Sequence, residues 1–167
     1  MLILFAGLYF NSISSFSIAF EPAHKNILKR PIYKTDNIMG NEFPIDVVVG
    51  VIMLTVVSLV AYHFGTKFDI AIEYYFAVYV FASIMLGFSN KSERFVFTSE
   101  PFRNPFLDFA YVVAFITVVI MLMFEPAATF LKLEALKIDQ MIKCFFLALT
   151  VPAFNELYKL FKKKIFK

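Results

Sequence analysis

The sequence predicts an all-α protein: a polytopic membrane helical bundle of about five transmembrane helices, with the N-terminus outside and the C-terminus in the cytoplasm. Of its 167 residues, 60% are hydrophobic and 17% are charged, whereas a soluble domain has roughly 45–50% apolar residues. The apolar residues come in blocks of about 20, the length that an α-helix needs to cross a bilayer. Basic residues gather in alternate connections between these blocks.

We expect one membrane domain over residues 1–167, with spans at about 1–20, 46–66, 70–89, 106–124 and 140–160. The first span has no charge before Glu21. A cleaved secretory signal is the alternative there, because Ser17 and Ala19 would suit a cleavage site. Signals carry a basic start, however, and this chain has none, so a retained span is favoured.

The other spans are free of charge or nearly so. The second has no charged residue after Asp46 at its start, and the third holds one carboxylate, Glu73, near its start. The fourth is short enough to need its flanks to complete the crossing. In the fifth, Lys143 is able to snorkel at one end and Glu156 lies near the other.

Lysine and arginine set the expected orientation, because cytoplasmic loops are enriched in them. We therefore place the loops 21–44 and 90–105 and the tail 161–167 in the cytoplasm. The basic residues on that side are Lys25, Lys29, Arg30, Lys34, Lys91, Arg94, Arg103, Lys159, Lys162, Lys163, Lys164 and Lys167. The remaining connections are a tight turn at 67–69 and the segment 125–139, in which acidic residues outnumber lysines.

Several polar residues in or near the spans have two interpretations. Asn11, with the serines that follow it, would either bond to neighbouring helices or line a cation path, and the first is favoured. Glu73 would be a buried proton or cation site or, as favoured, an interfacial residue. For Glu156, a capping or salt-bridge role is favoured over transport. His63 is expected at a helix end in the interface, and the lysine-rich tail would bind anionic lipid or anchor the topology.

The sequence shows no cofactor motif and no group of metal ligands. Cys144 is the single cysteine, and the two histidines, His24 and His63, lie far apart. We therefore predict no catalytic residues, no cofactor in this chain and no internal disulfide. The net charge of +3 sits in loops rather than in a stripe, so nucleic acid is not an expected partner.

Three segments together are similar to the C-terminal membrane domain, from the sixth to the tenth transmembrane helix, of P-type cation-transporting ATPases of the calcium-pump group. Residues 17–31, SIAFEPAHKNILKRP, resemble the stretch after the sixth helix, and residues 89–105, SNKSERFVFTSEPFRNP, resemble the connection after the eighth. Residues 124–163 resemble the hairpin of the last two helices. The ending of that hairpin is seen here as Pro152, Asn155, Glu156, Leu157 and Lys159.

The resemblance implies ATP-driven cation transport through an aspartyl-phosphate, but this sequence lacks the Asp-Lys-Thr-Gly-Thr phosphorylation motif. The cation ligands of the family's sixth helix fall on Gly7, Phe10 and Asn11, of which only Asn11 has a side-chain oxygen. The ligand of the eighth helix falls near Ala82 and Ser83, where no carboxylate stands. Asn11 is thus the one candidate cation ligand.

We therefore expect the C-terminal membrane module of a P-type cation pump, present as a separate or truncated chain, that supports the transport domain and is not catalytic alone. Its expected partners are membrane lipid and the missing N-terminal half of the pump. The alternatives are a pump-derived accessory or interaction subunit of the membrane and a fragment without function.

Overall fold

The structure, a computed structural model, describes residues 2, 4, 7, 43–90 and 104–165. Every regular element that it defines in the ranges 43–90 and 104–165 is a helix. In chain order these are α2 (Phe43–Thr66), α3 (Ala71–Asn90), α4 (Pro105–Met123), α5 (Glu125–Phe130) and α6 (Ile138–Ile165). Most of the predicted first span, including Asn11 and Phe10, lies outside the described residues, as do most of the loops 21–44 and 90–105.

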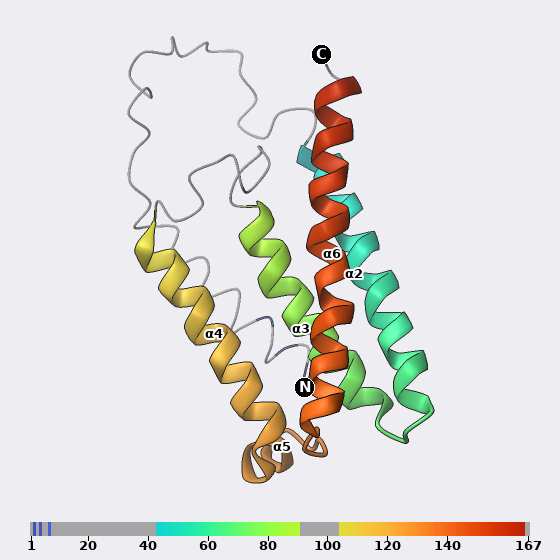
Figure 1. The fold of residues 1–167 in the computed structure, drawn as a ribbon, viewed down its shortest axis with the longest axis vertical. Coiled ribbons are helices and arrows are strands. Elements are labelled where there is room, and N and C mark those ends of the chain that lie inside the picture. The colour runs from blue at the N-terminus through green and yellow to red at the C-terminus, as the bar shows by residue number, and fades with distance from the viewer. Residues whose placement is uncertain (1, 3, 5–6, 8–42, 91–103, 166–167) are drawn as a thin grey trace.

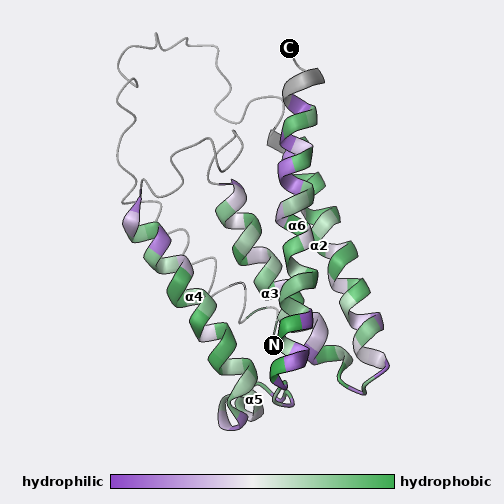
Figure 2. Ribbon diagram, in the orientation of Figure 1, coloured by the Kyte–Doolittle hydropathy of each residue, from purple (hydrophilic) through white to green (hydrophobic). Residues whose placement is uncertain are grey.

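Four of the described helices, α2, α3, α4 and α6, are long and apolar enough to cross a membrane. They correspond to the predicted spans 46–66, 70–89, 106–124 and 140–160. This confirms the predicted all-α, multi-pass membrane bundle. Figure 2 shows the pattern: the middles of the helices are hydrophobic, and hydrophilic residues gather at the upper part of α6 and at the start of α4.

Helix α3 is the centre of the bundle and lies between α4 on one side and the α2–α6 pair on the other (Figure 1). Its residues 76–78 and 80–82 are all buried, so more than one face of the helix is covered. A helix that is apolar all round and covered in this way belongs to the interior of a bundle.

Helix α2 meets its neighbours through small residues. Gly50, Ser58, Ala61 and Gly65 are buried. Small side chains let helix backbones approach closely, which favours packing in lipid, where burying large apolar groups gains little. Valines, leucines and isoleucines cover much of the remaining surface of α2 and are exposed, as expected for a face turned to lipid.

Helix α4 packs through one stripe of residues at intervals of three and four, which places them on one face. The stripe consists of Leu107, Ala110, Ala114, Val118 and Leu122. The start of the helix is capped by Asn104, whose side-chain oxygen accepts a hydrogen bond from the Leu107 backbone N–H (3.1 Å), and Pro105 stands in the first turn.

Three phenylalanines join α3, α4 and α6 within the bundle. The ring centroids of Phe81 and Phe115 are 5.1 Å apart, those of Phe115 and Phe145 5.7 Å, and those of Phe81 and Phe145 6.2 Å. The second and third pairs meet edge to face, an arrangement that aromatic rings prefer to a face-to-face sandwich.

The connection after α4 forms a short helix that the sequence did not indicate. The Glu125–Pro126 pair begins α5, where proline is well tolerated. The chain then folds back, since the Leu136 N–H donates to the Leu122 carbonyl (2.8 Å). Leu131, Leu133 and Leu136 are buried, so this connection closes that end of the bundle.

The helix ends that lead into the three basic segments lie at one end of the bundle. These are the start of α2, the end of α3, the start of α4 and the end of α6 (Figure 1). Lys162 near the end of α6 reaches Asp46 in the first turn of α2, with Nζ 2.7 Å from Oδ2. That the three basic segments share one side of the membrane stays a prediction.

The cytoplasmic location of the basic segments is likewise a prediction, and a reporter fusion tests it. A reporter fused after Lys167 should be active only in the cytoplasm, because the basic segments hold this end of the bundle there. Activity outside would reverse the orientation.

A second prediction concerns the turn between α2 and α3. A Cβ added at Gly65 would lie 2.6 Å from the Ala71 Cα and 2.8 Å from the Ile70 carbonyl oxygen, and neither backbone atom can rotate away. We expect Gly65→Ala to destabilise the protein by about 1–3 kcal/mol, measured as thermal unfolding in detergent. Gly50→Ala is the matched control, because its Cβ would meet only Leu86, at 3.6 Å. Equal unfolding temperatures for the two variants would contradict the packing of this turn.

Candidate functional site: a polar clamp between α3 and α6

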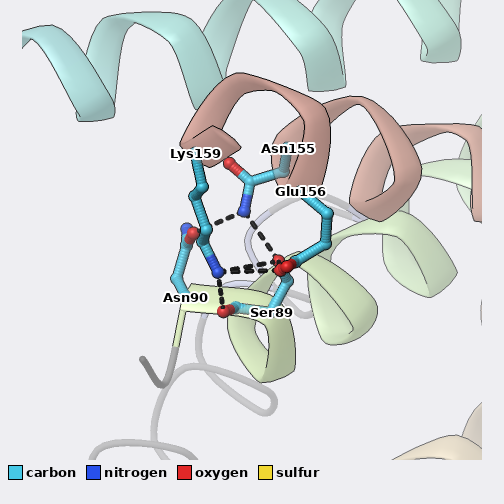
Figure 3. A network of polar contacts seen from close by, with 5 residues as sticks. All are labelled: Ser89, Asn90, Asn155, Glu156 and Lys159. Atoms are coloured by element: carbon cyan, nitrogen blue, oxygen red, sulfur yellow. Dashed lines mark hydrogen bonds and ion pairs between the residues drawn. The ribbon is translucent and has the colours of Figure 1, made fainter. Parts of the chain in front are cut away.

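Five polar residues join the end of α3 to the C-terminal half of α6 (Figure 3). Ser89 and Asn90 are the last two residues of α3, and Asn155, Glu156 and Lys159 come from α6. We call this set the polar clamp. On α6, the intervals of three and four residues that separate Lys159 from Glu156 and Asn155 place all three side chains toward one side of the helix. The helix therefore presents its polar group as a unit to α3.

Asn155 is the most buried of the three α6 residues, with 6% of its surface exposed. Its amide nitrogen donates to the Ser89 hydroxyl oxygen (2.7 Å) and to the Asn90 side-chain oxygen (2.8 Å). One amide thus uses both of its hydrogens on the neighbouring helix.

The Ser89 hydroxyl is the junction of the clamp. It donates to Glu156 Oε1 (2.6 Å) while it accepts from Asn155 and, at 3.4 Å, from Lys159 Nζ. A hydroxyl has one hydrogen to donate and two lone pairs, so this buried group is fully satisfied. That matters because a buried hydroxyl without a partner is costly.

The charges of the clamp form a shielded ion pair. Lys159 Nζ lies 2.8 Å from Glu156 Oε1, with only 10% and 13% of the two side chains exposed. Lys159 also donates to the Ser89 backbone carbonyl, one of the carbonyls that the last turn of a helix leaves without an intrahelical partner. Lys159 thereby caps α3 from α6. The favoured salt-bridge role of Glu156 is what the structure shows.

A second polar link ties α6 to α2 at the same end. The Tyr158 hydroxyl donates to Asp46 Oδ1 (2.9 Å), and Lys162 bonds to the other oxygen of that carboxylate (2.7 Å). Asp46 is 43% exposed as a side chain, so we expect less stabilisation from this link than from the clamp.

Glu73 lies at the other end of the bundle and differs from expectation. It is in the first turn of α3 but is 9% exposed, because the connection after α5 covers it. Its carboxylate accepts a hydrogen bond from the Glu134 backbone N–H (3.1 Å). Glu73 thus holds that connection against α3. It does not reach out into the interface.

The other residues considered from the sequence are not gathered into one site. Ala82 is buried, and the Ser83 hydroxyl donates to the Tyr79 carbonyl of its own helix (2.7 Å). His63 is exposed in the last turn of α2, and Cys144 is buried in the apolar core. Asn11 lies outside the described residues. Within residues 43–90 and 104–165, no group of three or more His, Cys, Asp or Glu side chains could hold a metal ion.

Sequence reasoning missed the partners on α3. The resemblance to the pump family names Asn155, Glu156 and Lys159 individually. Ser89 and Asn90 belong only to the longer segment 89–105 that resembles that family. The available signal was their position: both are polar and close an apolar span, where a polar group needs a partner from another helix. The clamp is suited to holding α3 and α6 together, since its charges are paired and the hydrogen-bonding capacity of the Ser89 hydroxyl is fully used.

Comparison with known proteins agrees with the resemblance of the separate segments. The family model described as "Cation transporting ATPase, C-terminus" matches residues 1–161. A search of the curated proteins returned no match. The matched region includes both halves of the polar clamp, which are 66 residues apart between Ser89 and Asn155.

A double-mutant cycle tests the clamp. Glu156→Gln and Lys159→Met should each lower the free energy of unfolding by about 2–3 kcal/mol, because each takes one charge out of a shielded, hydrogen-bonded ion pair. The double variant should lose less than the sum of the two. The measurement is denaturant unfolding in detergent micelles.

Asp139→Asn is the matched control for the cycle. It breaks the Asp139–Lys143 pair on the same helix, whose atoms are 3.6 Å apart and whose side chains are more than half exposed. We expect a change below about 1 kcal/mol. Strictly additive losses in the cycle, or a control as costly as Glu156→Gln, would show that the clamp does not act as a unit.

Proposed function

Because the chain belongs to the family of cation-transporting ATPase C-terminal domains, we propose that it is the structural membrane module of a P-type cation pump. In this role it is a multi-pass membrane protein whose helices support the transport helices and carry out no catalysis themselves. We further propose that it acts as a separate or truncated chain and that it associates with a chain that carries the rest of the pump.

The polar clamp is the observation that carries this proposal. Two of the segments that resemble the pump family, 89–105 and 124–163, are distant in sequence, and the clamp brings their polar residues into direct contact. A set of bonds that fixes one helix against another suits a part whose function is to hold its shape. The paired charges of Glu156 and Lys159 suit fastening better than transport, which needs ligands that can bind and release an ion.

The absence of catalytic sequence motifs agrees with a supporting role. The phosphorylation sequence that such pumps require is not present in these 167 residues. Ala82 and Ser83, at the position of a family cation ligand, offer no carboxylate, and the Ser83 hydroxyl is bonded within its own helix. The phosphoryl and cation chemistry would then be supplied by the partner chain.

Co-expression tests the proposal. The chain should co-purify with a second chain that carries the phosphorylation domain and the first five helices of a cation pump, and only the pair should form an acid-stable phosphoenzyme and take up cations into vesicles. Glu156→Gln should reduce the amount of assembled pair, whereas Asp139→Asn should not.

Two results would contradict the proposal. Formation of a phosphoenzyme by the chain alone would overturn the non-catalytic role. Failure to bind a pump half while the chain is folded in the membrane would instead favour an accessory subunit or a fragment without function.

A further inference from the structure

A pocket of about 580 Å³ opens at the end of the bundle opposite the polar clamp, among α2, α3, α6 and the turn that joins α2 to α3. Its walls are mostly apolar and include Phe64, Phe68, Phe146 and Leu147. The volume falls within the roughly 300–1,000 Å³ of sites that bind small molecules. A pocket of this size suits one amphiphile and is small for a partner helix.

Two lysines line the same pocket from different elements. Lys67 stands in the turn after α2, with Nζ 5.4 Å from the centroid of the Phe64 ring. Lys143 comes from the start of α6, with Nζ 5.6 Å from the centroid of the Phe68 ring. Both ammonium groups thus lie over aromatic walls of the pocket, within the range of cation–π attraction.

Acidic residues nearby offset part of this charge. Asp139 lies 3.6 Å from Lys143 in a pair that is more than half exposed. In the part of the chain that the structure describes, Lys67 has no ion pair, and Asp69 in the same turn does not line the pocket. Lys67 therefore keeps its positive charge at the mouth, whereas Lys143 shares its ammonium group with an exposed carboxylate.

Tyr74 supplies an unused polar group in the wall. The residue is 3% exposed, its ring stacks on Phe68 at 6.3 Å between centroids, and its hydroxyl has no hydrogen-bond partner. A buried hydroxyl without a partner is rare and costly. The hydroxyl oxygen is itself buried, so an acceptor atom in the pocket removes that cost once the neighbouring side chains shift to let it reach the oxygen.

We propose that this pocket binds one anionic phospholipid of the surrounding bilayer. An acyl chain lies against the apolar wall, the phosphate lies between Lys67 and Lys143, and a lipid oxygen accepts a hydrogen bond from the Tyr74 hydroxyl. The position suits the ligand, because both lysines stand near the ends of spans, at the depth of lipid headgroups. The two ammonium groups select an anionic over a zwitterionic lipid. The site is separate from the polar clamp and does not depend on the proposed pump role.

Lipid titration tests the site. The purified protein in detergent is titrated with dioleoylphosphatidylglycerol or dioleoylphosphatidylcholine, and the bound lipid is counted by native mass spectrometry. Phosphatidylglycerol should bind the more tightly. At about 1 kcal/mol per basic residue, the double variant K67Q/K143Q should bind it about 25-fold more weakly. The matched control is K132Q/K137Q, which removes the same charge at the same end of the bundle but outside the pocket.

The hydroxyl is tested with Tyr74→Phe. Without lipid, this variant should melt at or above the temperature of the unchanged protein, since it removes a buried group that has no partner. The rise in melting temperature caused by phosphatidylglycerol should be smaller than in the unchanged protein.

Three results would overturn the proposal. The first is equal binding of the two lipids, and the second is a loss in K132Q/K137Q as large as in K67Q/K143Q. The third is an unchanged lipid effect in Tyr74→Phe.

Discussion

The hydrogen bonds of one hydroxyl, that of Ser89, are the constraint on which the arrangement of this membrane module depends. The hydroxyl gives its hydrogen to Glu156 and accepts from Asn155 and Lys159, so it is satisfied in one orientation of α6 relative to α3. A helix turns about 100° per residue, and a rotation of α6 by a single residue would carry its polar group away from the end of α3. Helix α3 also packs against α2 and α4. By fixing α6 against α3, the clamp therefore fixes the position of α6 in the whole bundle.

Apolar packing holds the middle of the bundle, but it discriminates less between helix orientations. Lipid tails are as apolar as leucine, so burying one more apolar side chain between helices gains little. Apolar contacts bring the helices close together, through the rings of Phe81, Phe115 and Phe145 and through the small residues of α2. The polar bonds at the helix ends instead specify the register of one helix against another. The two ends of α3 also differ in their polar groups. The fully satisfied clamp fixes α6 against α3, while the Tyr74 hydroxyl at the other end of α3 has no partner and is the group that we propose a lipid satisfies.

Much of the fold could be predicted from the sequence, because the spans are blocks of apolar residues and a block of that length has few alternatives in a membrane. The Glu156–Lys159 salt bridge was predictable too, since residues three apart on a helix are neighbours. The partners Ser89 and Asn90 were not, because contacts between residues 65–70 apart depend on how the helices pack. Helix α5, with six residues, is too short to show a helical period, and the burial of Glu73 follows from a fold of the chain after α5 that leaves no local pattern. Asn11, the one predicted cation ligand, lies outside the described residues.

Amide hydrogen exchange in bilayer nanodiscs tests the central claim, that the clamp holds α6 against α3, most directly. The measurement compares the unchanged protein with Asn155→Ala, which removes two hydrogen bonds across the helix pair and leaves the charged pair in place. Exchange should rise at residues 86–90 and 155–162 and stay the same in the middle of α4, because the loss is confined to one end of the bundle. Unchanged exchange at these two segments, or an equal rise along all the helices, would contradict the claim.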